Sequence, residues 1–189
     1  AMLSRRLRLV GPLLDLLNPK VYLNFTRQMS FELAEVSQQL YQLRAEGRLP
    51  DERCALGVDD EDQDPQDVRA AARCNRLVQQ SVTYYGRFIE TYHEHGKVPA
   101  KVDDDSTRAY ITARLNRARL RTKMRGLGRD DQVEAHKLAL REYEWILDYG
   151  RRHPEVATKP EIGLATELKL CEELAGMLPA RLSNLAARR

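Results

Sequence analysis

Apolar residues recur every three or four positions along almost the whole sequence, and alternation with a period of two is nearly absent. This periodicity is typical of α-helices, because residues three and four positions apart share one face of a helix. Several of the predicted helices carry apolar residues on two sides. A helix with two apolar sides needs a neighbour on each of them, so the sequence predicts an all-α fold in which antiparallel helix pairs stack in layers.

Prolines, glycines and capping residues divide this pattern into separate helices. The first is expected at about residues 3–17, with a kink or break at Gly11–Pro12. Asn18 as N-cap and Pro19 at the first helical position predict a second helix that runs to about Glu46. The later helices are expected at about residues 65–92, from Asp103–Asp105 to the glycines near 126–128, at 130–152, at 161–177, and in a last short helix from Pro179.

Two apolar sides are visible in the second predicted helix. Its main stripe consists of Tyr22, Phe25, Met29, Leu33, Val36, Leu40 and Leu43. A second apolar side consists of Leu23, Phe31, Ala34 and Tyr41.

One stretch near the middle of the fifth predicted helix resembles a tetratricopeptide repeat (TPR). Ala139, Tyr143 and Ile146 have the small–aromatic–aliphatic spacing of the second TPR helix, and Pro154 ends the stretch. The predicted helices are longer than the repeat of roughly 34 residues allows, and the rest of its pattern is absent. We therefore expect a TPR-like, right-handed α-α superhelix that forms a single domain over residues 1–189.

Residues 107–129 contain eight Lys or Arg and no acid. On a helix, two opposite apolar faces separate these bases into two flanks. The faces consist of Ile111, Leu115, Ala118 and Thr122 on one side and of Ala113, Leu120 and Met124 on the other. One flank consists of Arg114, Arg117, Arg121 and Arg125, and the other of Arg108, Arg119 and Lys123.

Three interpretations of this basic helix are open. The arginines can pair with acids elsewhere in the stack, form an Arg-lined surface for an acidic segment of a partner protein, or contact nucleic acid. A helix held on both faces cannot lie freely in a groove of DNA. The run has Tyr110 as its only aromatic residue, and the net charge of the chain is only +3. We therefore expect a protein partner and no nucleic acid.

Residues 51–66 are expected to form an acidic loop. Asp60, Asp62 and Asp64 have the spacing of calcium ligands, but Pro65 stands where the turn requires glycine and Ala71 where it requires a bidentate glutamate. The loop is therefore expected to be solvated and without metal. Its acids are candidate contacts for a basic surface of a protein partner: Asp59, Asp60, Glu61 and Asp62.

Signals of catalysis are missing from the sequence. His93 and His95 lack further ligands at zinc-site spacing, and there is no phosphate-binding glycine loop or nucleophile motif. We expect no enzymatic activity, no cofactor and no metal. Neither a membrane-spanning segment nor a signal peptide is expected, and the three cysteines favour thiols in a reducing compartment.

The segment LNPKVYLNFTRQMSFELAEVSQQLYQL, residues 17–43, resembles the signature of the C-terminal domain of the kinesin-binding protein family, also written KBP or KIF-binding protein. The matching residues are Asn18–Pro19, Tyr22–Leu23, Arg27–Gln28 and Phe31 to Glu35. Further similarity follows in the same order in SVTYYGRFIETY, REYEWILDYGRRHPE and ELAGMLPARLSNL.

This resemblance implies an α-solenoid of TPR-like helix pairs that has no enzymatic activity. Family members bind the motor domains of a subset of kinesins and keep them off microtubules, which affects transport. The chain is then expected to be cytoplasmic, associated with the cytoskeleton, and the C-terminal part of a longer protein. Because an isolated solenoid segment leaves an apolar end face uncovered, we also expect that this chain can self-associate through that end. The alternative is a general TPR-type adaptor that holds an acidic peptide on its Arg-lined helix. No contact residue is carried over from the family.

Overall fold

The computed structural model describes residues 2–16, 18, 21–48, 65–93, 98–124, 129–159 and 162–187. Within these ranges the chain is all-helical and has no strand. The helices are α1 (Met2–Leu16), α2 (Leu23–Ala45), α3 (Pro65–Glu90), α4 (Asp104–Arg121), α5 (Arg129–Arg152), α6 (Glu155–Thr158) and α7 (Ala165–Ala187).

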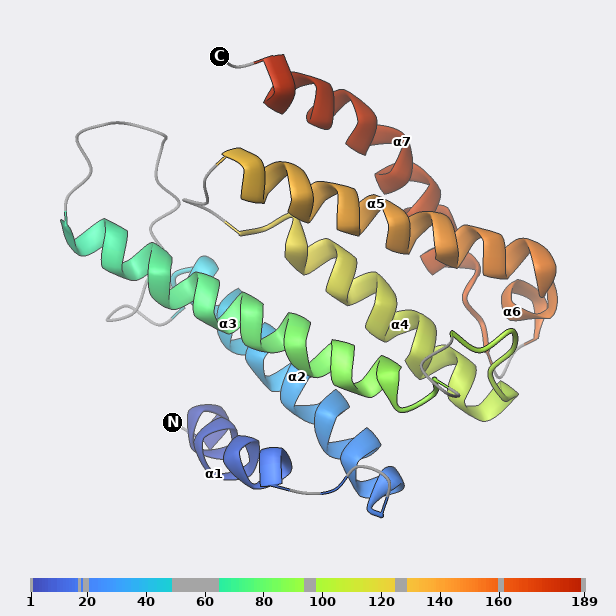
Figure 1. Ribbon diagram of the computed structural model, residues 1–189, viewed down its shortest axis with the longest axis horizontal. Coiled ribbons are helices and arrows are strands. Elements are labelled where there is room, and N and C mark those ends of the chain that lie inside the picture. The colour runs from blue at the N-terminus through green and yellow to red at the C-terminus, as the bar shows by residue number, and fades with distance from the viewer. Residues whose placement is uncertain are drawn as a thin grey trace.

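Each long helix packs against the long helices before and after it in the chain. The contacts run from α1 to α2, α2 to α3, α3 to α4, α4 to α5 and α5 to α7, with α6 forming a single turn between α5 and α7. Figure 1 shows the result as a stack in which α1 and α7 lie at opposite edges and α4 lies in the middle. The predicted all-α solenoid of neighbouring helix pairs is confirmed, and its right-handed, TPR-like superhelical sense stays a prediction.

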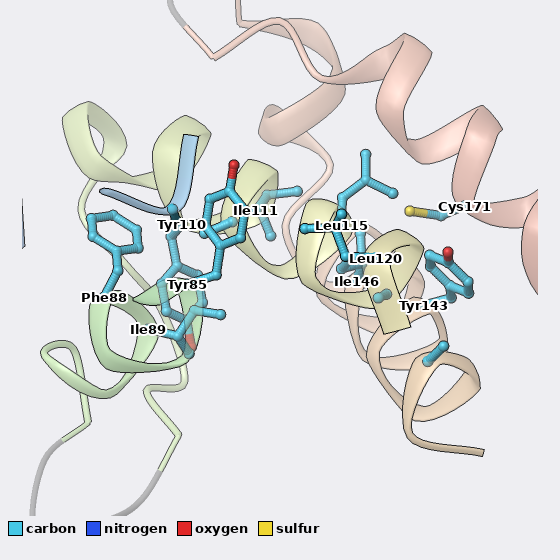
Figure 2. Packing of buried hydrophobic residues seen from close by; sticks show 14 of the residues in the cluster. Tyr85, Phe88, Ile89, Tyr110, Ile111, Leu115, Leu120, Tyr143, Ile146 and Cys171 are labelled. Atoms are coloured by element: carbon cyan, nitrogen blue, oxygen red, sulfur yellow. The ribbon is translucent and has the colours of Figure 1, made fainter. Parts of the chain in front are cut away.

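One hydrophobic core runs through the stack, from Leu14 in α1 to Leu178 in α7. Helix α4 contributes to it from both sides, as predicted: Ile111, Leu115 and Ala118 are buried on one face, and Ala113 and Leu120 on the other. Figure 2 shows Tyr85, Phe88 and Ile89 on one side of α4 and Tyr143 and Cys171 on the other. Full burial of a large aliphatic side chain contributes about 1.5–3 kcal/mol, so α4 stabilises both halves of the stack.

Aromatic rings connect four of the helices. A continuous row of contacts, with ring centroids 4.5–5.8 Å apart, runs through Tyr85, Phe31, Phe88, Tyr92, Tyr110, Trp145, Tyr149 and His153. Most of these contacts are edge-to-face, the arrangement that places the positive edge of one ring against the negative face of the next. The row therefore ties α2, α3, α4 and α5 together with defined geometry.

The Tyr85 hydroxyl joins three helices within the core. It donates a hydrogen bond to Oε1 of Gln38 in α2 at 3.1 Å and accepts one from Nδ2 of Asn116 in α4 at 3.2 Å. Burial raises the pKa of Tyr85 to about 12, so the hydroxyl keeps its proton throughout the physiological range.

Two predicted helix boundaries are wrong. Helix α2 begins at Leu23 rather than directly after Asn18, because the Asn18 carbonyl accepts hydrogen bonds from Val21 and Tyr22 and forms a separate turn. Pro179 does not begin a new helix but lies inside α7. Leu178, just before it, is buried in the core, and this packing keeps the helix continuous although proline removes one backbone hydrogen bond.

The predicted stripe of α2 is also only partly buried. Leu33, Val36 and Leu40 lie in the interior, whereas Tyr22 and Phe25 remain 52% and 47% exposed. Helix α1 packs on α2 without covering this first turn, so the N-terminal end of the stripe faces solvent. Among the cysteines, Cys171 is a buried free thiol, as expected. Cys74 departs from the expectation because it is disulfide-bonded.

Candidate protein-interaction surfaces

Three of the four arginines on the predicted flank of α4 converge on a single carboxylate. Nη1 of Arg114 lies 2.7 Å from Oε2 of Glu142 in α5, Arg117 donates to Oε1 of the same carboxylate, and Nη1 of Arg121 lies 3.5 Å from Oε1. We call these four residues the Glu142 cluster. The spacing of three and four residues along α4 places the guanidinium groups on one flank, and Glu142 is the acid that faces it.

Arg114 is the innermost member of the cluster and is only 5% exposed. Its guanidinium carbon lies 3.8 Å from the centroid of the Trp145 ring, and Nη2 donates to the Tyr110 hydroxyl at 3.1 Å. Desolvated guanidinium groups gain from such stacking on an indole face. Arg114 therefore belongs to the interior of the α4–α5 interface and leaves almost no surface for a partner.

The cluster carries more positive than negative charge, because three guanidinium groups share one carboxylate. Burial lowers the pKa of Arg121, and the neighbouring Arg117 adds to the effect. Burial also lowers the pKa of His93, which follows α3, and Arg114 lowers it further. His93 therefore stays neutral near pH 7 and adds no further positive charge to the cluster.

The structure describes only some of the candidate binding residues that were predicted from the sequence. The structure brings Arg114, Arg117 and Arg121 together through Glu142, which agrees with the interpretation that they pair with acids in the stack. Contact of these arginines with a partner protein stays a prediction. The other five candidate residues lie outside the described residues: Arg125, Asp59, Asp60, Glu61 and Asp62.

Glu142 itself was missed by the sequence analysis, although a signal was present. Glu142 lies three positions after Ala139 and four positions before Ile146. Both of these residues are fully buried, so Glu142 is an acid on the core-facing side of α5. A carboxylate on such a face requires a buried cation as partner, and the basic α4 is the neighbouring helix.

We expect Glu142→Gln to lower the free energy of unfolding by roughly 3 kcal/mol, because it leaves three largely buried guanidinium groups without their counter-charge. Urea unfolding followed by circular dichroism measures this change. Glu144→Gln is the matched control, because Glu144 is exposed on the same helix, and its effect should stay below about 0.5 kcal/mol. Equal effects of the two substitutions would contradict a stabilising role of the cluster.

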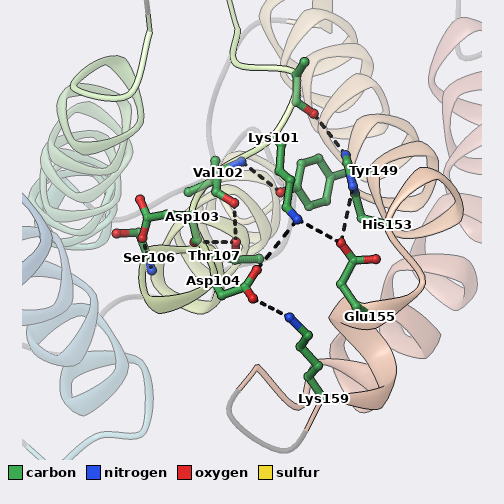
Figure 3. Close-up of polar contacts among 11 residues, drawn as sticks. Lys101, Val102, Asp103, Asp104, Ser106, Thr107, Tyr149, His153, Glu155 and Lys159 are labelled. Carbon is green, nitrogen blue, oxygen red and sulfur yellow. Dashed lines mark hydrogen bonds and ion pairs between the residues drawn. The ribbon is translucent and has the colours of Figure 1, made fainter.

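A second polar group surrounds the N-terminus of α4 (Figure 3). Of the three aspartates from which a cap was expected, Asp103–Asp105, Asp103 is the N-cap, and its Oδ1 accepts a hydrogen bond from the Ser106 amide at 3.0 Å. The Tyr149 hydroxyl accepts from the Val102 amide at 3.1 Å and so connects α5 to the beginning of α4. Thr107 adds bonds to the carbonyls of Val102 and Asp103.

Charged side chains extend this capping group towards α6. Lys101 lies 3.9 Å from Asp104 and 3.3 Å from Glu155, while Lys159 pairs with the other oxygen of Asp104. His153 approaches Glu155 at 3.6 Å. These residues lie at the surface, and no group of acids, histidines and cysteines in the described ranges has an arrangement that could hold a metal ion. The network therefore joins α4, α5 and α6.

The pKa of Asp104 is lowered by its hydrogen bond from Lys159. A carboxylate with a lowered folded-state pKa stabilises the fold above its unfolded-state pKa, and this contribution is lost as the pH falls through the folded-state value. Asp104→Asn should therefore lower the melting temperature at pH 7, and the difference from wild type should shrink between about pH 5 and pH 3.

Melting curves at several pH values test this expectation. Asp105→Asn is the control, since Asp105 is exposed in the same turn and forms no ion pair with a described residue. A difference between wild type and Asp104→Asn that stays constant down to pH 3 would show that the carboxylate acts through something other than its charge.

Exposed apolar side chains gather on α1 and at the beginning of α2. Leu9, Leu13 and Leu16 follow one side of α1 at spacings of four and three, and Leu16 is 83% exposed. We refer to these leucines, together with the exposed apolar residues just before α2 and in its first turn, as the α1–α2 apolar surface: Leu9, Leu13, Leu16, Val21, Tyr22, Leu23 and Phe25. Large exposed apolar surfaces usually mark places where proteins meet. In the described part of the chain, no helix has the length and apolar character to cross a membrane.

The described helices define an α-solenoid whose exposed apolar and charged surfaces suit contact with proteins. Comparison with known proteins identifies the family: the chain belongs to the family described as "KIF-1 binding protein C terminal", which matches residues 1–185. The resemblance drawn from residues 17–43 is thereby confirmed.

Relatives named KIF-binding protein occur in several vertebrates. The chain is 30% identical over 188 residues to that of Gallus gallus, 31% over 185 residues to that of Danio rerio and 30% over 185 residues to that of Xenopus tropicalis. These alignments cover 97–99% of the chain but only 27–29% of each relative, so the chain spans less than a third of their length. No solved structure matches the chain.

Proposed function

We propose that this chain is a non-enzymatic module that takes part in binding kinesin motor domains. The observation that carries the proposal is the family match over residues 1–185, together with relatives whose name states that they bind KIF proteins. The stacked helices support it, because a solenoid offers extended surfaces for protein partners.

The proposed consequence of binding is that the motor is kept off microtubules, in a cytoplasmic, cytoskeleton-associated setting. A motor must present a positive surface to hold acidic tubulin, so a protein that masks this surface needs acidic and apolar groups. The acidic residues Asp59 to Asp62 are the candidates for the charged contact. The α1–α2 apolar surface is the candidate for the apolar contact, and it is also the surface through which we expect self-association.

The alternative, an adaptor that holds an acidic peptide on α4, has less support. Its arginines already share Glu142, and Arg114 is 5% exposed, so a peptide would have to displace an internal carboxylate to reach it. If such displacement occurred, charge reversal of the arginines would abolish peptide capture without unfolding. For arginines engaged inside the fold, the same reversal lowers the melting temperature.

Co-sedimentation tests the kinesin proposal. Purified motor domains are pelleted with microtubules, with and without the protein at its full natural length. We expect the protein to bind the motor and to leave more of it in the supernatant. Neutralising Asp59, Asp60, Glu61 and Asp62 to their amides should weaken this effect about tenfold, because four charges facing a positive surface are lost.

A variant neutralised at Asp130, Asp131, Glu134 and Glu144, four exposed acids of α5, loses the same charge elsewhere and serves as the control. Equal weakening by both variants would assign the effect to net charge rather than to the acidic segment. Failure of the full-length protein to bind any motor domain would remove the proposal.

Analytical ultracentrifugation tests the expected self-association. Dimers should form at micromolar concentration, and Leu13→Gln with Leu16→Gln should shift the protein towards monomer by removing apolar contact area. Dimerisation that is unchanged in this variant would place the interface elsewhere.

A further inference from the structure

We propose that the outward side of α3 binds an acidic helical segment of a protein partner, a contact separate from kinesin binding. This side of α3 carries a groove of about 290 Å³. Its lining, which we call the α3 groove, consists of Arg76, Gln79, Gln80, Thr83, Tyr84 and Arg87.

The lining residues follow a single straight side of the helix. Counted from Arg76, they lie three, four, seven, eight and eleven positions along α3. At a rise of 1.5 Å per residue, the two arginines therefore stand roughly 16 Å apart, with uncharged side chains between them. The groove has a cation at each end and a row of amide and hydroxyl groups along its length.

None of the described residues that line the groove is an acid, although acids make up a large part of the chain's charged residues. Arg73 extends the same side of α3 by one more turn and is exposed. Neither Arg73 nor Arg76 forms an ion pair with another residue in the part of the chain that the structure describes. Glu90, the next acid along α3, lies outside the lining. The positive potential around Arg73 and Arg76 is therefore available to an external anion.

Part of the groove is held in place by the fold. The guanidinium carbon of Arg87 lies 5.7 Å from the centroid of the Tyr84 ring, and Tyr84 itself is only 8% exposed. Helix α1 approaches this ring at Gly11, where an added Cβ would lie 2.6 Å from the Tyr84 hydroxyl oxygen. Any larger residue at position 11 would require α1 or Tyr84 to shift. Helix α1 therefore packs against Tyr84, and the guanidinium group of Arg87 in turn lies over the Tyr84 ring.

Charge and shape together favour an acidic helix as the occupant. Guanidinium groups bind carboxylates through paired hydrogen bonds, and a helix presents carboxylates at the same three- and four-residue spacing that the groove has. The glutamine amides can donate to and accept from other polar groups of that helix.

Nucleic acid fits the same surface less well. A single strand of a duplex carries a phosphate about every 3.4 Å along the axis, so about five phosphates would lie between the two arginines without a cation. The buried Tyr84 also leaves no exposed ring on which a base could stack. The groove is opposite in sign to the acidic surface proposed for kinesin binding, so the two proposals can fail independently.

Fluorescence anisotropy of a labelled peptide tests the inference on the full 189-residue chain. The probe is a helical peptide of alanine and glutamine with two glutamate pairs three turns apart, and its lysine-for-glutamate version is the negative control. We expect binding of the glutamate peptide only, weakened roughly tenfold by Arg76→Gln with Arg87→Gln and severalfold by Arg76→Gln alone.

Arg141→Gln with Arg151→Gln is the matched control, because both arginines are exposed on α5 and ten residues apart. It should leave peptide affinity unchanged. Melting curves show whether each variant is folded, and the single substitution of the exposed Arg76 keeps the test valid if Arg87→Gln unfolds the chain. Equal weakening by the α3 and α5 variants, no binding of the glutamate peptide, or tighter binding of a single-stranded oligonucleotide that needs the same arginines would overturn the inference.

Discussion

The structure depends on the burial of α4 from two opposite sides. Ile111 and Leu115 enter one part of the core and Ala113 and Leu120 the other, so α4 separates the α1–α3 half of the stack from the α5–α7 half and also connects them. A helix used in this way has only two narrow flanks left for polar side chains. On one flank Arg114, Arg117 and Arg121 therefore lie between helices and need a partner there, whereas Arg108 and Arg119 on the other flank reach solvent.

The Glu142 cluster is the consequence of this constraint on one flank. A shift of α5 by one turn would move Glu142 by about 5.4 Å and leave Arg114 buried without its carboxylate. Such an unpaired buried charge costs several kcal/mol, so the cluster disfavours other registers between α4 and α5. The aromatic row adds to this selectivity, since Tyr110 of α4 meets Trp145 of α5 edge to face. Ionic and aromatic contacts thus specify which packing the two-sided apolar helix adopts.

Local patterns predicted most of the fold because they depend on nearby residues. The two faces of α4, the Asp103 cap and the buried Ala139–Tyr143–Ile146 face follow from helical periodicity and from one side chain meeting an adjacent amide. The features that sequence reasoning missed depend on distant residues. Pro179 stays inside α7 because Leu178 is packed in the core, and Phe25 is exposed because no neighbour covers the first turn of α2.

The same difference between nearby and distant residues decides how much of the candidate surfaces could be predicted. The basic flank of α4 was visible in the sequence, but its pairing with Glu142 required knowing that α5 lies beside it. The α3 groove was not recognised at all, because its arginines are separated by neutral residues and do not form a run.

Of the surfaces described, the α1–α2 apolar surface and the α3 groove both lie in the first half of the stack. Helix α4, which supports that half, is internal, and its Arg114, Arg117 and Arg121 are paired with Glu142. We therefore propose that partners are recognised by the outer surfaces and that the middle of the stack holds these surfaces in place.

Amide hydrogen exchange of α4 tests this account most directly. A helix buried on both faces can open only when the stack comes apart, so the amides from Ile111 to Leu120 should exchange with the free energy of global unfolding, while the exposed C-terminal turns of α7 exchange faster. Exchange of the α4 amides through local opening, at a free energy well below that of global unfolding, would contradict the central role given to this helix.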